Sequence, residues 1–199
     1  MHSILKIMTT KTTATKKTTT KIVELPPHPF AFEVFDLASK QRSAAKKAEV
    51  LQKYNHPSIR ALLIWNFDES VISMLPEGDV PYGDPTEQTV YKGGSLGSKI
   101  SSEVRDMYEK GTMSVSDEKQ GRTTIEREYQ NFYHFIKGGN DGLKALRRET
   151  MFINMLTGLH PLEAEILILV KDKKLSDKYK ITKDHVAKAF PQIKWGGRS

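Results

Sequence analysis

The amino-acid sequence predicts a mainly α-helical protein with a single compact domain. Apolar side chains recur at helical spacing before residue 68 and again after residue 123. Residues that start or stop helices stand at the ends of these stretches. Between them, residues 76–100 are rich in glycine and proline. We therefore expect a compact multi-helix domain over residues 30–195 with a long Gly/Pro-rich loop at 76–100, a disordered basic arm and connector at 1–29, and a tail at 196–199.

The N-terminal arm is expected to be disordered. Eight threonines lie between Thr9 and Thr20, interleaved with lysines, and no apolar periodicity is present. Residues 1–21 carry five lysines and no acid, whereas residues 22–199 hold 26 basic and 24 acidic residues. Most of the net charge of +7 therefore belongs to the arm. Residues 25–29 include three prolines, which predict a stiff, extended connector.

Three short helices are predicted in the N-terminal half, over residues 30–40, 44–54 and 57–67. The first has an apolar stripe that begins at Ala31 with the spacing i, i+3, i+4, i+7. Ser43 is a typical N-cap for the second. Pro57 is tolerated in the first turn of the third, after His56, which is expected to serve this turn. Three helices with short links predict a small bundle.

More helices are predicted in the C-terminal half, over residues 102–110, 124–137, 141–157 and 161–171, with a short last helix after Thr182. The stripe Ile125, Tyr129, Phe132 and Ile136 supports one continuous helix that ends at two glycines. In the following helix Asp141 is the expected cap, and the expected core residues are Leu143, Leu146, Ile153 and Leu156. The segment 71–75 is apolar, but its pattern does not decide between helix and strand.

The sequence offers no pattern typical of an enzyme, a cofactor site or a metal site. It has no cysteine, which excludes disulfides and fits a reducing compartment. None of the six histidines lies at i+3 or i+4 from another. In the glycine-rich segment 93–99, Ser98 precedes Lys99, which is the reverse of a phosphate-binding loop. Asp68 and Glu69 are adjacent and would diverge on a helix. No apolar run approaches the roughly 18 residues of a membrane span.

Clusters of lysine and arginine favour binding to nucleic acid through phosphates. Arg42, Lys46 and Lys53 share one predicted helix face, and residues 171–188 hold seven lysines against three aspartates. If these patches converge, about 6–10 phosphate contacts become feasible, with steep salt dependence. The candidate residues are Lys11, Lys16, Lys17, Lys21, Lys40, Arg42, Lys46, Lys47, Lys53, Arg147, Arg148, Lys171, Lys173 and Lys174.

Several longer motifs resemble a known protein family. They read FDLASKQRSAAKKAEVLQKY, LPEGDVPY, FIKGG, RRETMFINMLTGLHPLEAEILILVKDKKL and AFPQI. They are similar to an uncharacterised family from large contractile-tailed bacteriophages of marine cyanobacteria. The resemblance covers about residues 30–195 and excludes the arm. It implies a phage protein made in the bacterial host cytoplasm, and it transfers no catalytic residue.

Three functions remain open at this point. The first is a non-enzymatic phage accessory protein that binds nucleic acid or a nucleoprotein complex through the arm and the basic helices. The second is a virion structural or assembly protein whose arm contacts its neighbours. The third is a modulator of a host protein, docking through the acidic residues 68–91 or a basic helix. None of these requires a membrane, and the sequence does not specify the oligomeric state.

Overall fold

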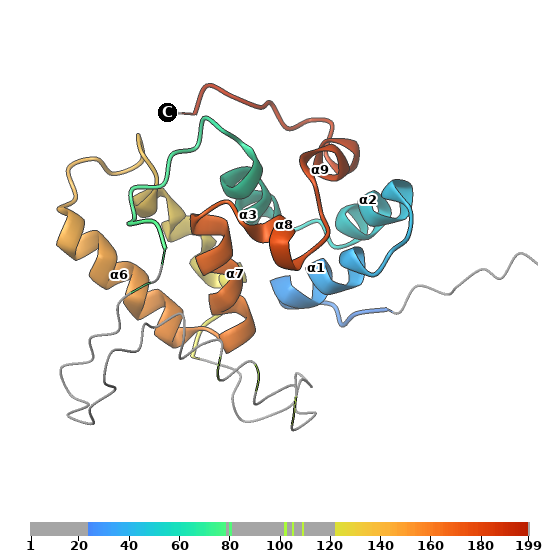
Figure 1. Ribbon diagram of the computed structural model, residues 1–199, viewed down its shortest axis with the longest axis horizontal. Helices are drawn as coiled ribbons and strands as arrows, with labels where there is room; N and C mark the ends of the chain where they lie inside the picture. The colour runs from blue at the N-terminus through green and yellow to red at the C-terminus, as the bar shows by residue number, and fades with distance from the viewer. Residues whose placement is uncertain are drawn as a thin grey trace, which may run out of the picture.

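The computed structural model describes residues 24–78, 80, 102, 105, 109 and 122–198. These residues are mainly helical, as predicted, and their only β pairing is one isolated bridge. The arm up to residue 23, most of the loop predicted at 76–100 and most of the helix predicted at 102–110 lie outside the described residues. Figure 1 shows the helices gathered into one body, with α3 and α7 at its centre.

The first three helices agree with the sequence to within one residue at each end. They are α1 (Ala31–Ser39), α2 (Ala44–Lys53) and α3 (Pro57–Phe67). The Ser43 hydroxyl accepts a hydrogen bond from the Lys46 N–H at 3.2 Å, so Ser43 is the predicted N-cap of α2. His56 caps α3 in the same way, because its Nδ1 accepts the Ser58 N–H at 3.1 Å.

The prediction of one continuous helix over residues 124–137 was wrong. The chain instead forms α5 (Ile125–Glu128) and then a 3₁₀ helix, η1 (Tyr129–Phe135). The tighter 3₁₀ turn places Phe132 and Phe135 three residues apart on one side. Both rings pack against Trp65 of α3, with ring centres 5.4 and 6.3 Å away. Aromatic packing on α3 therefore outweighs the helical periodicity seen in the sequence.

The turn after η1 requires its two glycines. Gly138 has a φ of +82°, a conformation that favours glycine. A Cβ atom on Gly139 would lie 2.0 Å from the Tyr133 carbonyl oxygen. Residues 135–137 also pair with the extended segment near Ser73, through hydrogen bonds from Met74 N–H to Phe135 O and from Lys137 N–H to Ile72 O. The pairing shows that the undecided segment 71–75 is extended.

Helix α6 (Ala145–Gly158) begins later than predicted. Lys144 is its N-cap, and the Asp141 carboxylate instead accepts the Gly138 N–H at 2.8 Å. Leu146 was expected in the core but is 77% exposed. The buried face of α6 consists of Arg148, Phe152, Met155 and Leu156.

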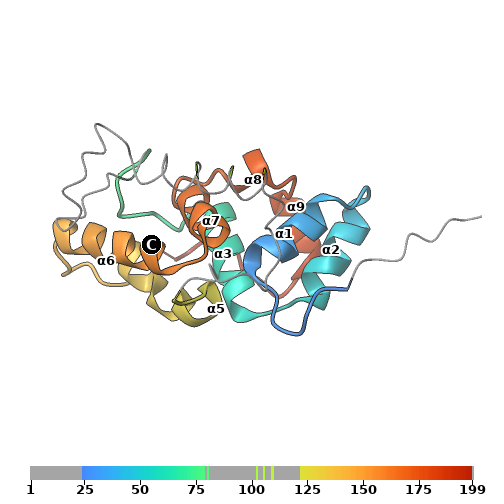
Figure 2. The same ribbon diagram turned by 90° about the horizontal axis from the view of Figure 1, so that it is seen from below.

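Helix α7 (Pro161–Lys171) has the predicted bounds and contacts α1, α3 and α6. Two shorter helices follow, α8 (Leu175–Lys178) and the expected α9 (Lys183–Ala189) after the Thr182 cap. Figure 2 shows α6 at one end of the body and α2 at the other, with α7 and α3 between them. Helix α9 packs against α2, and the Gln52 side chain donates to the Ala189 carbonyl.

The end of the described chain returns to α3. Asp68, which is 2% exposed, accepts the Gly196 N–H on both carboxylate oxygens and pairs with Arg198 Nε at 3.2 Å. Burial alone would raise the pKa of Asp68, but hydrogen bonds from Ser70 and Gly196 and the Arg198 charge lower it below its usual value. Residues 196–198 are therefore anchored to the body.

Candidate functional site

Several of the predicted nucleic-acid-binding cations lie inside the fold. Lys47 is 8% exposed, and its amine donates to the carbonyls of Ala38 and Ser39 at 3.4 and 3.0 Å. These carbonyls end α1, where a positive charge is favourable. Lys47 therefore serves as a C-terminal cap of α1, and its amine is not presented to a phosphate in this structure.

Arg148 is a second interior cation. It is 2% exposed and donates to three carbonyls, those of His134 (2.8 Å), Asn140 (3.0 Å) and Leu143 (2.9 Å). One guanidinium thus ties the end of η1 and the following turn to α6. The prediction that Arg148 contacts nucleic acid does not fit this placement.

The amines of Lys171 and Lys173 are also used within the fold. Lys171 donates to the carbonyls of Pro76 (2.7 Å) and Gly78 (3.0 Å) and pairs with Asp172. Lys173 donates to the carbonyls of Trp65 (2.9 Å) and Asp68 (2.7 Å) at the end of α3. Both residues were predicted to bind nucleic acid, but their donors are occupied by backbone carbonyls.

Lys173 also has an unusual backbone. Its φ is 59°, a conformation that glycine normally supplies at this position after a helix. The Lys173 and Lys174 N–H groups close the end of α7 onto the carbonyls of Val170 and Leu169. Lys173 adopts this strained conformation although it carries a side chain, and its amine donates to the Trp65 carbonyl near the end of α3.

The other described candidates remain on the surface. Lys40, Arg42, Lys53, Arg147 and Lys174 are exposed, and Lys46 is half-buried. Lys40 pairs with Asp36 at 2.6 Å, and Lys53 pairs with Glu24 at 3.0 Å rather than with Glu49 as its spacing suggests. Exposed pairs of this kind contribute little to stability, so they leave the lysines able to exchange partners. Lys11, Lys16, Lys17 and Lys21 lie outside the described residues.

The packing of α9 against α2 brings together lysines that are far apart in the sequence. The Lys180 N–H donates to the Ser39 hydroxyl at 3.3 Å, beside Lys40. The amine of Lys47 lies on the Ser39 carbonyl. We call Lys40, Lys47, Lys180 and Lys188 the basic cluster; Lys180 and Lys188 were not among the predicted site residues. Their signal was present in the lysine-rich stretch 171–188, but only the fold assigns it to this end of the molecule.

Two pKa shifts at the basic cluster come first from burial and second from neighbouring positive charge. Burial, and then the charge of Lys180, lower the pKa of Lys47. Burial also lowers the pKa of His185. The charges of Lys47 and Lys188 lower this pKa further, whereas the charge of Asp184 raises it. Like charges gathered in this way destabilise one another, and an anion would relieve their repulsion.

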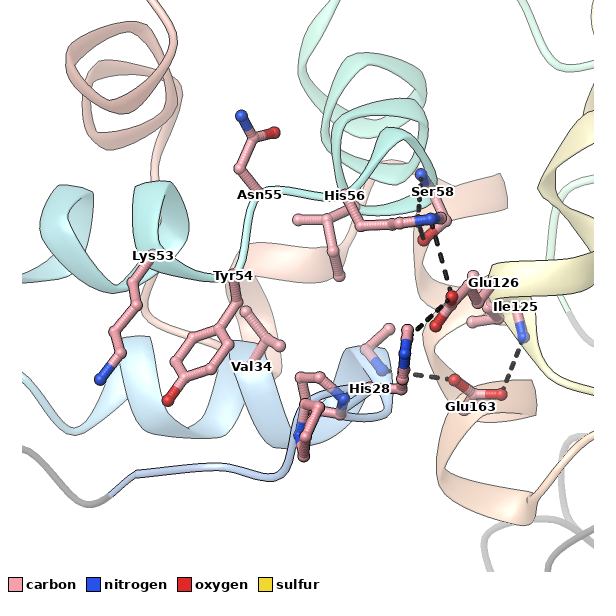
Figure 3. A pocket seen from close by; sticks show the side chains of 14 residues that line it. His28, Val34, Lys53, Tyr54, Asn55, His56, Ser58, Ile125, Glu126 and Glu163 are labelled. Atoms are coloured by element: carbon pink, nitrogen blue, oxygen red, sulfur yellow. Dashed lines mark hydrogen bonds and ion pairs between the residues drawn. The ribbon is translucent and has the colours of Figure 1, made fainter.

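A pocket of about 190 Å³ lies beneath the connector, at the C-terminal end of α2. Its walls come from the connector, α1, the link between α2 and α3, α5 and α7 (Figure 3). At one end two histidines approach the same oxygen, Oε1 of Glu126: His28 Nδ1 at 3.3 Å and His56 Nε2 at 3.7 Å. Sequence reasoning missed this group because its members come from three separate segments.

Glu163 forms the floor of the pocket and joins three helices. It is 1% exposed, and its two oxygens accept the N–H groups of Ala31 (3.3 Å) and Ile125 (2.9 Å). Ala31 and Ile125 begin α1 and α5, and Glu163 itself lies in the first turn of α7. Burial raises the pKa of Glu163 to about 7, although these two hydrogen bonds act in the opposite direction.

The histidines before proline serve as helix caps, as the sequence indicates. His160 Nδ1 accepts the Leu162 N–H at 3.1 Å at the start of α7, like His56 at the start of α3. Across residues 24–78 and 122–198, no group of three or more His, Asp or Glu side chains is arranged to hold a metal ion. Within the part of the chain that the structure describes, every helix is too short or too polar to cross a bilayer.

Comparison with known proteins places the chain in a family. A family of unknown function, DUF6433, matches residues 34–117 and 112–177, which together span more than half of the 199 residues. No curated protein and no solved structure matches the chain significantly. The matched region contains α2, α3, α5, α6 and α7, and therefore most of the helical body. The chain belongs to the DUF6433 family, whose function is unknown.

Proposed function

We propose that this chain is a non-enzymatic protein that binds nucleic acid through the phosphate backbone. The observation that carries the proposal is the basic cluster at the junction of α1, α2 and α9. Lys40, Lys180 and Lys188 are exposed there, and Arg42, just before α2, and Lys46, in its first turn, add further positive charge. Phosphates are the ligands best suited to several lysines that are held close together without a fixed geometry.

The arm adds to the positive charge available to a phosphate backbone. Residues 1–21 add five lysines, and the described chain begins beside α2, where Glu24 pairs with Lys53 at 3.0 Å. A lysine-rich leader of this kind would raise the number of phosphates bound and the dependence of binding on salt. The exposed acids nearby, Asp36, Glu49 and Asp184, limit the net charge of the face. We therefore expect moderate affinity and no direct reading of base sequence.

The resemblance to phage proteins gives this activity a setting. A phage accessory protein that acts in the bacterial cytoplasm would meet both phage DNA and its transcripts. Phosphate contacts do not by themselves distinguish the two. The proposal therefore names nucleic acid as the ligand class and leaves the choice between DNA and RNA to measurement.

Fluorescence anisotropy with labelled DNA and RNA of equal length tests the proposal. Binding by the full chain should fall linearly on a logarithmic salt scale. Replacing Lys40, Lys180 and Lys188 together with glutamine should weaken binding by about tenfold or more, and should reduce the salt slope by about one for each phosphate that is no longer bound. Replacing Arg122, Lys137 and Lys144, which are exposed and lie outside the basic cluster, is the matched control. Binding that ignores both salt and the first triple substitution would contradict the proposal.

A further inference from the structure

The pocket beneath the connector has the size of a small-molecule site. Its volume of about 190 Å³ is close to the roughly 150 Å³ that holds a benzene-sized guest in other proteins. It is smaller than the roughly 300 Å³ at which drug-sized sites begin. An occupant would have roughly six to nine non-hydrogen atoms. Apolar side chains, including Val34 and Ile59, line part of the wall.

The polar end of the pocket is negatively charged and lacks a cation of its own among the described residues. Glu126 and Glu163 both line it, and Glu163 is held only by backbone N–H groups. Glu33 on α1 adds to the negative potential at Glu163. The lysine that lines the pocket, Lys53, lies at the opposite end from Glu126 and Glu163 (Figure 3).

Two histidines approach the Glu126 carboxylate at the polar end of the pocket. The Ser58 N–H occupies Nδ1 of His56, so the neutral ring carries its proton on Nε2, toward Glu126. His28 approaches the same oxygen of Glu126 from the connector.

We propose that this pocket binds a small organic cation, an aliphatic ammonium or guanidinium, with its charged group at Glu126 and Glu163 and its hydrocarbon part against Val34 and Ile59. Such a ligand would supply the counter-charge that the buried Glu163 carboxylate lacks. It would also stabilise the contact between the connector and the body, because His28 and Ala31 both lie at the site. This inference is independent of nucleic-acid binding, since the basic cluster lies elsewhere on α2 and α9.

The proposal predicts coupling between cation binding and deprotonation of Glu163. A cation favours the ionised carboxylate, so binding releases a proton when Glu163 is protonated beforehand. Binding should therefore strengthen as the pH rises through about 7, the pKa that burial gives Glu163.

The test is an NMR titration of the full chain with butylammonium, and with 1-butanol as the uncharged ligand of the same length. Butylammonium should shift the amide signals of Ala31, Ser58 and Ile125, and should bind about tenfold more tightly at about pH 8 than at about pH 6. The same titration with butylguanidinium separates the two cation types. Butanol should bind much more weakly and with no dependence on pH.

Substitutions make the result specific to the site. Glu163→Gln should weaken butylammonium binding by about tenfold and flatten its pH dependence, whereas Glu49→Gln, on the exposed part of α2, should leave both unchanged. If Glu163→Gln does not fold, Glu126→Gln, at a side chain that is 37% exposed, decides the question. Equal binding of butanol and butylammonium, or cation binding that survives in the folded glutamine variant, would overturn the proposal.

Discussion

The two ends of the molecule use positive charge in opposite ways. At the α6 end, Arg148 is buried and all of its hydrogen bonds in the described structure go to backbone carbonyls. At the α2–α9 end, Lys40, Lys180 and Lys188 are exposed, and only Lys47 is consumed by a helix terminus. Lysine and arginine occur in the sequence of both ends. The difference teaches that the number of cations in a stretch does not indicate a binding surface until their hydrogen-bond partners are known.

The strongest test of this contrast is at Arg148. Replacing it with methionine should lower the free energy of unfolding by about 3–5 kcal/mol, because three half-buried carbonyls lose a charged donor and the buried guanidinium is removed. Arg147→Met, one residue earlier and exposed, should change it by less than about 0.5 kcal/mol. Urea denaturation followed by circular dichroism measures both. Equal effects of the two substitutions would show that Arg148 is not an internal clamp.

Lys171 extends the test to the centre of the fold. Lys171→Met should cost about 2–4 kcal/mol, since it leaves the Pro76 and Gly78 carbonyls and the Asp172 carboxylate without their shared amine. Lys174→Met serves as the exposed comparison and should be nearly neutral. Thermal melts of both variants at matched pH provide the measurement. If Lys171→Met leaves the stability unchanged, water replaces the amine at no cost in free energy.

Glu163 is the acidic counterpart of these interior cations. Its pKa rises from 4.5 to about 7 on folding, so the native state holds this proton between those values while the unfolded state releases it. Its contribution to stability is therefore largest below about pH 4.5 and falls by about 2–3 kcal/mol as the pH rises to about 7.

The difference between wild type and Glu163→Gln isolates this effect. His160 and His185 have lowered pKa values, and lowered histidines give stability that rises with pH, so they partly mask Glu163 in the wild type alone. Denaturation curves across the acid range should show that the free energies of unfolding of wild type and Glu163→Gln differ by less as the pH falls. A constant difference would mean that Glu163 is ionised throughout the range.

The smallest expected effect on stability is at the basic cluster. The exposed Lys180→Gln and Lys188→Gln substitutions should change the free energy of unfolding by less than about 0.5 kcal/mol each. Under the proposed function, the same pair should still reduce the salt slope of nucleic-acid binding by about two. A loss of stability without any change in binding would mean that these lysines, like Arg148, have a structural role.

Local signals in the sequence were accurate where one helix could be recognised by its own ends. Pro57, Pro161 and the Ser43 cap locate their helices, because capping and proline geometry depend on neighbours in the chain. The prediction failed at residues 124–137, because η1 depends on Trp65, which is distant in the sequence. The prediction also failed at Leu146, because the face of α6 that packs on the body contains Arg148 and leaves Leu146 exposed.

The sequence by itself determined that the chain is helical, that its surplus positive charge lies mainly in the first 21 residues, and that it lacks thiol chemistry. Only the tertiary structure decided which cations are internal caps, that Lys180 joins Lys40 at Ser39, and that Glu163 meets the first residues of α1 and α5. The physical reason is that helix formation is set by contacts within a few residues. Whether a charged group is free or occupied depends on carbonyls and amides that only the folded chain brings within hydrogen-bonding distance.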